Sequence, residues 1–376
     1  MAPKEALEAP KVGSTHMVKW KGAPHKARIV EVRGQLRNGD PAEYYVHYIG
    51  QDRRLDEWVL PDVVDKRPVS DASSAATIVI EETLPAAPVA EGQKVTRNMK
   101  RKFDEMNFHK PGEVDPKLLD LEREREEATK VRNVETIYFG KYKIGTWYFS
   151  PYPDEYKDQK TLYLCEFCLK YMRLPDSLVQ HRQTCKQRRP PGTMVYHKDT
   201  IKIYEVDGKD EKLYCQNLCL LSKLFLDHKT VYYDIEPFYF YVLTETEKSK
   251  GREVDHLVGY FSKEKHSLDD YNLACILTLP PFQRRGFGRM LIEFSYEASK
   301  IEGKIGSPER PLSDLGMVGY RSYWQSVLLS LLKTSQGCSM SLKQLSGTTS
   351  IRVEDVVSTL SSMEMIRYWK GENMIW

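Results

Sequence analysis

The sequence predicts an α+β protein in which a small β-domain precedes a larger domain of helices and a central sheet. Three observations predict this class. Apolar and polar residues alternate through "HKARIVEVRG" and "EYYVHYIG", which is the period of half-buried strands. The stretch "VSDASSAATIVIEETLPAAPVAEGQ" then shows no sustained period and is rich in Ala, Pro, Ser and Thr. After it, strand-like runs and helical apolar spacing alternate to the end of the chain.

The composition narrows the classes of protein to which the chain can belong. The 376 residues leave room for two or three domains. Charged residues make up 29% and hydrophobic residues 41%, which is ordinary for a globular protein. The formal net charge is only +3, so nucleic-acid binding would have to come from local patches. The seven cysteines are too sparse for a disulfide scaffold, which favours a reducing setting inside the cell.

Membrane and secretory segments are not expected. No uncharged apolar run approaches the roughly 20 residues that span a bilayer. The first ten residues, "MAPKEALEAP", lack the apolar core of a secretory signal. We therefore expect a cytosolic or nuclear protein.

The domain boundaries follow from these changes in pattern. Residues 11–68 are predicted to form the β-domain and residues 69–130 a flexible linker. The linker contains a basic cluster, "KVTRNMKRK", which could hold a phosphate backbone or act as a nuclear import signal. The charge-dense "LEREREEATKVRN" after it is predicted to be a solvated helix. Residues 131–376 form the larger domain.

Several elements of the larger domain can be placed by their period. A helix is predicted over "KLYCQNLCLLSKLFLDHKT", where Leu218, Leu221 and Phe225 share a face. The runs "FYFYVLTE", "HLVGYFSKE" and "NLACILTLP" are predicted strands. Another helix follows "QRRGFG", and its apolar face is expected at Leu291, Phe294, Ala298 and Ile301.

The C-terminal segments predict a winged-helix-like lobe. "SLKQLSG", "RVEDVVSTLSSME" and "MIRYWKGENMIW" indicate a short helix, a second helix and a hairpin that ends at Trp376. This order is typical of DNA-binding wings, but few basic residues lie on the second helix. A helical cap packed on the larger domain is an equally good interpretation.

Four residues have the spacing of a zinc site. The pattern is Cys165-x2-Cys168-x12-His181-x3-Cys185. Two cysteines two residues apart can present both thiolates to one ion, and a histidine and cysteine four apart can complete a tetrahedron from a helix. Because all four positions are filled by protein, we expect structural rather than catalytic zinc.

The segment Gln283–Gly288, "QRRGFG", has the composition of a phosphate-binding loop at the start of a helix. It is not a P-loop, because Arg289 and Met290 stand where that motif requires lysine and serine or threonine. It is not a dinucleotide-binding fingerprint, because Leu291 occupies the position of the third glycine. The pyrophosphate of coenzyme A and a plain strand-to-helix turn both remain possible.

The blocks around this loop resemble the MYST family of histone acetyltransferases. They are "NLCLLSKLFLDHKTVYYDIEPF", "VGYFSKEKHS", "YNLACILTLPPFQRRGFGRMLIEFSYE", "GSPERPLSDLG" and "YRSYW". The resemblance extends over residues 131–376 and includes the finger. In addition, "EYYVHYIGQDRRLDEWV" resembles the chromo-barrel of the subgroup that carries one.

The resemblance implies a fold and a function. The fold would be a GNAT-like acetyltransferase core at residues 191–310, with a C2HC zinc-finger lobe at 163–187 and a winged-helix-like lobe at 311–376. The activity would be transfer of acetyl from acetyl-CoA to histone lysines, on the histone H4 tail, in the nucleus. The implied partners are histones or nucleosomes and a multi-subunit chromatin complex.

The resemblance also implies the catalytic residues. A lysine amine has a pKa near 10.4, so about one molecule in a thousand is nucleophilic at neutral pH and a general base is needed. The family's base aligns with Glu309, between Pro308 and Pro311. Cys275 is either a nucleophile that accepts the acetyl group first or a small pocket residue. We favour direct attack by the substrate lysine, with Cys275 shaping the pocket.

The expected cofactor residues follow by the same alignment. Backbone groups of Ile276, Leu277 and Thr278 are expected to hold the thioester and pantetheine arm. The pyrophosphate is expected to lie against Arg284, Arg285, Gly286, Phe287, Gly288 and Arg289. Ser313 and Ser322 are expected to contact the cofactor from the other side.

Lys223 aligns with a lysine that the family acetylates on itself. It lies inside the apolar stretch "LLSKLFL", where a buried charge would be costly and acetylation would remove it. The alternative is a lysine whose ammonium extends to the surface.

The barrel and the overall function leave alternatives. The aromatic residues of the barrel could bind methyl-lysine through cation–π attraction. They could instead pack in the core, or the barrel could dock RNA, DNA or protein. These residues are Trp20, Tyr44, Tyr45, Tyr48 and Trp58. A non-enzymatic chromatin adaptor is the main rival function, but it would need neither the glycine loop nor Glu309. A small-amine acetyltransferase would have no use for the barrel.

Overall fold

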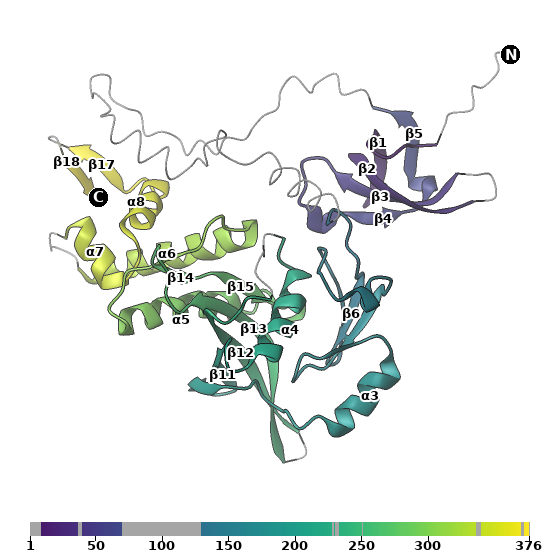
Figure 1. Ribbon diagram of the computed structural model, residues 1–376. Helices are drawn as coiled ribbons and strands as arrows, with labels where there is room; N and C mark the ends of the chain where they lie inside the picture. Colours follow the sequence, from purple (N-terminus) through teal and green to yellow (C-terminus); the bar gives the residue numbers. More distant parts are fainter. Residues whose placement is uncertain are drawn as a thin grey trace. The chain divides into compact units, whose positions relative to one another are not determined.

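The computed structural model describes residues 9–36, 40–69, 129–227, 229, 233–249, 251–335, 340–369 and 372–375 (Figure 1). The chain divides into two compact units, Met1–Val131 and Arg132–Trp376. The predicted basic cluster and nearly all of the predicted linker lie outside the described residues. So does most of the helix expected over "LEREREEATKVRN".

The first unit contains an antiparallel five-stranded sheet, which confirms the predicted β-domain. Its strand order is β4-β3-β2-β1-β5. The strands are β1 (Thr15–Trp20), β2 (Ala23–Gln35), β3 (Pro41–Tyr48), β4 (Glu57–Val59) and β5 (Val64–Pro68). Alternation along β3 directs Tyr44, Val46 and Tyr48 into the core of this sheet. The first unit is therefore a small barrel-like domain whose core is built from alternating strand residues.

The second unit begins with a zinc-finger-type lobe. A four-stranded sheet of order β7-β6-β8-β9 precedes helix α3. These elements are β6 (Thr136–Phe139), β7 (Tyr142–Gly145), β8 (Thr161–Leu164), β9 (Tyr171–Met172) and α3 (Pro175–Thr184). The helix begins with Pro175 at its first position, where the missing N–H costs nothing. The lobe packs β8 and β9 beside the helix that carries His181.

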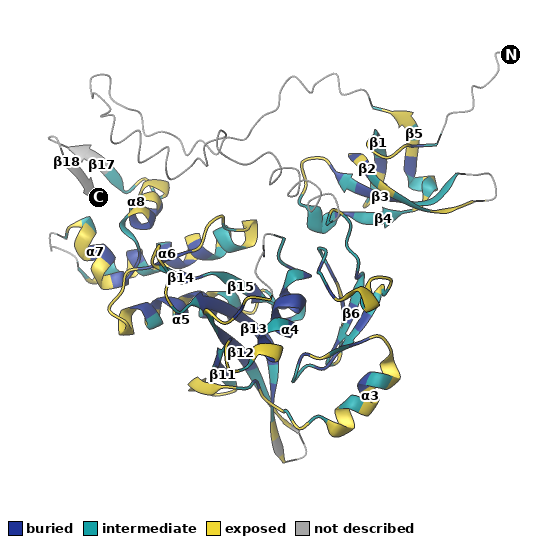
Figure 2. Ribbon diagram, viewed as in Figure 1, coloured by how far each residue is buried: buried dark blue, intermediate teal, exposed yellow. Residues whose placement is uncertain are grey.

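The centre of the second unit is an antiparallel sheet of order β10-β11-β12-β13-β15. Its strands are β10 (Thr193–Lys198), β11 (Ile201–Asp207), β12 (Phe238–Ser249), β13 (Arg252–Glu264) and β15 (Cys275–Thr278). Figure 2 shows β12 and β13 largely buried, whereas α3 is largely exposed. Helix α4 (Lys212–Lys223) contributes Leu218 and Leu221 to the same core. Phe225 is also buried, but it lies in the turn after α4 and not on its face.

The strand predicted over "NLACILTLP" is two strands. β14 (Tyr271–Leu273) pairs in parallel with β16 (Ser307–Pro308), whereas β15 pairs with β13. The break falls at Ala274, whose N–H donates to the carbonyl of Ser262 on β13. A continuous apolar run could not reveal that its two halves join different sheets.

Helix α5 (Phe287–Ile301) follows the glycine loop as predicted, but its buried face is shifted. Leu291 is fully buried and Phe294 packs partly against the core. Ile301 is 88% exposed, so its assignment to the apolar face is wrong. The buried face is instead completed by the small polar side chains of Ser295 and Ser299, which bond to backbone carbonyls of their own helix.

The C-terminal lobe has the predicted order and one helix that was not predicted. The predicted elements are α7 (Leu342–Thr349), α8 (Val353–Ser362), β17 (Ile366–Trp369) and β18 (Glu372–Ile375). The additional helix α6 (Asp314–Thr334) is capped by Ser313, whose hydroxyl accepts from the N–H of Gly316. Its buried Trp324 donates from Nε1 to the hydroxyl of Tyr296 on α5 at 2.8 Å. Figure 1 shows α7 and α8 beside α6, at the end of the unit away from α3.

The remaining described elements are short. Single 3-10 turns occupy Arg53–Leu55, Pro61–Val63, Asp154–Tyr156 and Pro280–Phe282. None of the helices in the described ranges is long and apolar enough to cross a bilayer.

Gly259 of β13 offers a test of this architecture. A Cβ there would lie 2.5 Å from the carbonyl oxygen of Leu277 on β15. Gly259→Ala is therefore expected to destabilise the protein by about 1–3 kcal/mol through overpacking. Differential scanning calorimetry should show a lower Tm. In the control Gly347→Ala, no atom lies within 4 Å of the added Cβ on α7, so its Tm should be unchanged or raised. Equal Tm values for the two variants would contradict the close approach of β15 to β13.

Candidate active site and zinc centre

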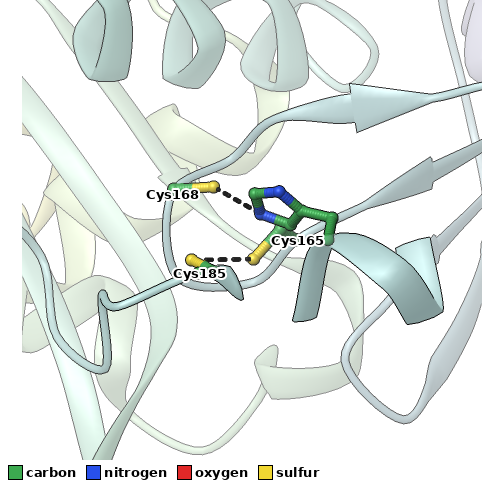
Figure 3. Close-up of side chains that lie close together, drawn as sticks. Cys165, Cys168 and Cys185 are labelled. Atoms are coloured by element: carbon green, nitrogen blue, oxygen red, sulfur yellow. Dashed lines mark hydrogen bonds between the residues drawn. The ribbon is translucent and has the colours of Figure 1, made fainter. Parts of the chain in front are cut away.

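The four predicted zinc ligands come together. Cys165 and Cys168 lie in the turn after β8, His181 lies on α3, and Cys185 caps the end of that helix. Their ligand atoms all lie within 4.8 Å of one another. Cys165 Sγ is 4.0 Å from Cys185 Sγ, and Cys168 Sγ is 3.1 Å from His181 Nε2. Figure 3 shows the three labelled sulfur atoms pointing toward one another. This donor set fits a tetrahedral zinc ion held entirely by protein.

The finger is tied to the central sheet by a charged contact. Glu166 accepts from His256 Nδ1 of β13 at 2.7 Å, and His256 Nε2 lies 3.5 Å from Glu247 of β12. The hydrogen bond to Glu166 raises the pKa of His256, although burial opposes it. The finger therefore supports the sheet that carries the rest of the site.

The predicted phosphate loop has the backbone that anion binding requires. Arg284 has φ +61° and Gly286 has φ +87°, both left-handed. No side chain caps α5, whose first internal bond runs from the N–H of Met290 to the carbonyl of Gly286 at 3.0 Å. The N–H groups of the first turn are therefore available to an anion, together with the positive end of the helix.

The arginines of the loop have different roles. Arg285 forms a two-pronged ion pair with Glu245 of β12, with N–O distances of 3.1 and 2.7 Å. Its guanidinium carbon also lies 4.8 Å from the ring centroid of Phe287 and 5.9 Å from that of Phe282. Arg285 therefore links the loop to strand β12 of the sheet. Arg284 is exposed and lies at the turn of the loop.

The cofactor residues expected on the far side lie on α6 or at its start. Arg289 of α5 has Nη1 at 3.4 Å from the hydroxyl of Ser322 on α6, so these two predicted residues are neighbours. Ser313 is the N-cap of α6, and its hydroxyl accepts from the N–H of Gly316 at 3.1 Å. A contact of Ser313 with the cofactor would have to share that capping oxygen.

The predicted pantetheine residues occupy an edge strand. Ile276, Leu277 and Thr278 belong to β15, which is last in the order of the central sheet. They pair with β13 on one side, and Gln283 Nε2 donates to the carbonyl of Thr278 at 3.0 Å. An edge strand leaves backbone groups on its outer side for a ligand.

Cys275 starts β15 and is half-buried. Its N–H donates to Ser262 Oγ at 3.2 Å, and its Sγ lies 3.8 Å from Lys229 Nζ. Lys229 is 6% exposed. Burial lowers the pKa of Lys229, but the Tyr260 hydroxyl and the thiols of Cys275 and Cys219 outweigh it and raise that pKa above its usual value. The charged group beside the thiol is therefore a lysine rather than the histidine of a conventional cysteine nucleophile.

Glu309 follows β16 beside β14. Its N–H donates to the carbonyl of Leu273 at 2.8 Å, which places the base candidate next to the strand that leads into Cys275. The side chain is exposed by area, yet the surrounding protein raises the pKa of its carboxyl group. Burial is the larger cause, Glu264 adds to it, and Lys229 opposes it. A raised pKa suits a carboxylate that must accept a proton near neutral pH.

Lys223 is only half-buried at the end of α4. Its ammonium donates to the carbonyls of Leu226 at 3.3 Å and Asp227 at 2.5 Å. The expectation of a costly buried charge is therefore met by Lys229 and not by Lys223. No sequence signal predicted a role for Lys229, Glu245 or Glu264, since each is an ordinary charged residue until its distant partner is known.

The predicted aromatic cage of the barrel divides into two groups. Tyr44 and Tyr48 are buried, and Tyr48 lies 5.0 Å from Trp20 between ring centroids. Tyr45 points to the other face of β3 and lies 5.2 Å from Trp58. The two indoles already have cations on their rings, Lys21 at 4.3 Å from Trp20 and Arg33 at 4.2 Å from Trp58. The five rings therefore do not surround one ligand in this arrangement.

Comparisons with known proteins show which families the parts of this chain match. A model described as the MOZ/SAS family matches residues 189–376, and a MYST family zinc finger domain matches residues 131–185. A Tudor-knot model, described as an RNA binding activity-knot of a chromodomain, matches residues 11–66.

Named relatives cover almost the whole chain. Histone acetyltransferase of the MYST family 1 from Arabidopsis thaliana is 49% identical over 97% of this chain and 78% of its own length. Histone acetyltransferase MOF from Drosophila melanogaster is 45% identical over 94% of this chain and 47% of its own length. The Histone acetyltransferase Tip60 homolog from Caenorhabditis elegans is 44% identical over 93% of this chain and 80% of its own length.

The fold and the site define an acetyltransferase that uses acetyl-CoA and contains structural zinc. The chain belongs to the MYST family of histone acetyltransferases. The GNAT-like core, the finger, the chromo-barrel and the enzymatic class expected from the sequence are thereby confirmed. The non-enzymatic adaptor is set aside, because the family is one of acetyltransferases.

Removing zinc should unfold the finger. In zinc-finger peptides such sites supply about 10–16 kcal/mol of apparent binding energy, so a chelator should abolish the native signals of residues around α3. Native mass spectrometry should show one zinc per chain in the untreated protein, and Cys168→Ala should lower that ratio. The matched control Cys215→Ala changes a buried cysteine outside the cluster and should keep the zinc. A native protein of unchanged mass and full stability in chelator would contradict the site.

Proposed function

We propose that this enzyme acetylates histone lysines, with the histone H4 tail as its principal substrate, and that it acts in the nucleus. The support for histones is that the named relatives are histone acetyltransferases. The single observation that carries the chemistry is the position of Glu309 beside the strand that leads into Cys275 and the cofactor loop. Labelled acetyl-CoA with histone octamer, nucleosome and free polyamine tests the substrate class. Equal labelling of the polyamine would contradict it.

Glu309 acts as the general base in this proposal. The substrate lysine amine attacks the thioester carbon of acetyl-CoA, Glu309 takes the proton from the amine, and the thiolate of coenzyme A leaves. The raised pKa of Glu309 brings its proton affinity closer to that of the reacting amine. Lys229 and Glu264 act on this base through their charges, in opposite directions.

Cys275 shapes the acetyl pocket rather than carrying the acetyl group. The thiol faces the ammonium of Lys229, which donates a proton and does not accept one. Direct transfer to the substrate lysine therefore needs fewer groups than an acetyl-cysteine route.

The cofactor is held from three sides. Backbone groups of β15 bind the pantetheine arm, and the first turn of α5 with Arg284 and Arg289 binds the pyrophosphate. Arg285 holds the loop through Glu245, and Ser322 lies beside Arg289. Acetyl-CoA supplies the activated acetyl group, and these residues orient it toward the substrate amine.

The other modules bring the enzyme to chromatin. The domain division at 11–68, 69–130 and 131–376 would place a chromo-barrel and a basic linker before the catalytic domain. We assign to them contact with RNA, DNA or a modified histone tail, as part of a multi-subunit complex. The match to a chromodomain knot of RNA-binding activity supports the RNA alternative, and the divided aromatic groups disfavour a ready-made methyl-lysine cage.

Two substitutions separate the mechanisms. Glu309→Gln should lower kcat by about 10²–10⁴-fold, because it removes the base. Cys275→Ala should keep most activity. Steady-state rates with a histone H4 peptide provide the measurement, and acetyl-CoA binding and zinc content show that each variant is folded. An active Glu309→Gln together with an inactive Cys275→Ala would favour an acetyl-cysteine intermediate.

The dependence of kcat/KM on pH tests the role of Glu309 as the base independently. Glu309 must be deprotonated to act, so kcat/KM should fall as the pH decreases through its pKa. Because that pKa is raised, the fall should begin above the ordinary glutamate value of about 4.3. Glu309→Gln should remove this limb of the profile.

Self-acetylation has two candidate lysines. Lys223 was predicted by alignment, whereas Lys229 is buried and lies next to Cys275 in the acetyl pocket. Because acetylation would remove a buried charge, we expect a larger fraction of acetylated lysine at Lys229 than at Lys223 after incubation with acetyl-CoA. Peptide mass spectrometry of the wild type, Lys223→Arg and Lys229→Arg provides the measurement. Acetylation confined to Lys223 would contradict this order.

A further inference from the structure

The segment that carries Glu309 is held between two parts of the second unit. On one side, the N–H of Glu309 donates to the carbonyl of Leu273 on β14. On the other side, the N–H of Gly306 donates to the carbonyl of Ser350 at 2.9 Å. The N–H of Arg352 donates to the carbonyl of Gly306 at 3.2 Å. Ser350 and Arg352 lie in the turn between α7 and α8. The C-terminal lobe is therefore in direct contact with the base-bearing segment.

One buried carboxylate completes this contact. Asp355 lies in the first turn of α8, and its side chain is only 4% exposed. Its Oδ2 accepts from Ser307 Oγ at 2.7 Å, and its Oδ1 accepts from the guanidinium of Arg310 at 2.5 Å. Ser307 and Arg310 flank Glu309 on both sides. A single carboxylate thus restrains the backbone before and after the proposed base.

A second contact fixes the opposite wall of the same region. The guanidinium of Arg352 donates to the carbonyl of Asp269, and its carbon lies 5.8 Å from the ring centroid of Tyr271 on β14. The start of α8 therefore holds both the strand that receives the Glu309 N–H and the segment that carries Glu309. Burial of Asp355 and Val356 also shows that this face of α8 packs inward.

We propose that Asp355 is a positioning residue for acetyl transfer, through which α8 of the winged-helix-like lobe aims the carboxylate of Glu309. The inference rests on the proposed role of Glu309 as the base. General-base catalysis requires the carboxylate within hydrogen-bond reach of the substrate amine, and a misplacement of about 1 Å can cost about 10²-fold in rate. The winged-helix-like lobe thus helps to position the proposed base and is not only a docking module.

Asp355→Asn tests this role, since asparagine keeps the size of the side chain but loses the charge that pairs with Arg310. The expected result is a kcat lowered by about 10–100-fold, with KM for acetyl-CoA changed less than about twofold, because the side chain of Asp355 bonds to Ser307 and Arg310 and not to the loop Gln283–Gly288. Glu354→Gln is the matched control, because it removes the same charge from the neighbouring exposed position of α8. It should leave kcat and KM unchanged. Wild-type kcat in a folded Asp355→Asn would overturn the proposal.

A double variant separates this inference from the assignment of the base. If Asp355 acts through Glu309, adding Asp355→Asn to Glu309→Gln should cause little further loss of kcat, because the group being aimed is gone. Full additivity of the two losses would overturn the inference while leaving Glu309 as the base. An active Glu309→Gln would remove the proposed function itself, and this inference with it.

Arg310→Ala covers the case in which Asp355→Asn does not fold. The side chain of Arg310 is 50% exposed, so its removal opens no cavity in the core, and Ser307 remains as a hydrogen-bond partner of Asp355. It should reproduce the loss of kcat with an unchanged KM for acetyl-CoA. Full activity in Arg310→Ala would overturn the proposal.

Discussion

The break between β14 and β15 at Ala274 is the constraint on which the candidate active site depends. β15 stays paired with β13 and runs from Cys275 toward the loop Gln283–Gly288, whereas β14 pairs in parallel with β16 and receives the backbone N–H of Glu309. Without the break, one strand would continue along the sheet, and Glu309 would not lie beside the strand that leads into Cys275. The close approach of β15 to β13 at Gly259 fixes the position of the whole arrangement.

Charges around this break are arranged in advance of the reaction. Lys229 lies buried beside Cys275. Its charge lowers the pKa of Glu309, whereas the charge of Glu264 raises that pKa. Arg285 is bound to Glu245, which leaves the first turn of α5 in place for an anion. Groups that are held before the substrate arrives need no reorganisation during the reaction, and this is a large source of catalytic power.

Local patterns predicted most elements of the fold, because their signals lie within a few residues. The strands of the β-domain, the clustering of the finger ligands, the turn into α5 and the C-terminal hairpin were predicted correctly, whereas one predicted strand is the two strands β14 and β15. Helix α6 was missed, although Ser313 offers a capping signal before an apolar face. Ile301 was misplaced, because the end of a helix can extend past the core that it packs against.

The sequence by itself determined the zinc ligands, the strand-to-helix loop Gln283–Gly288, the class of enzyme and the order of its modules. Those signals are short-range spacings or long blocks of resemblance, and they do not depend on knowing the contacts. Tertiary structure alone decided that Arg285 binds Glu245, that Lys229 rather than Lys223 is buried, and that Asp355 reaches both sides of Glu309. Each of these facts joins residues far apart in the chain, and the charge of a side chain has no meaning for function until its burial and its partner are known.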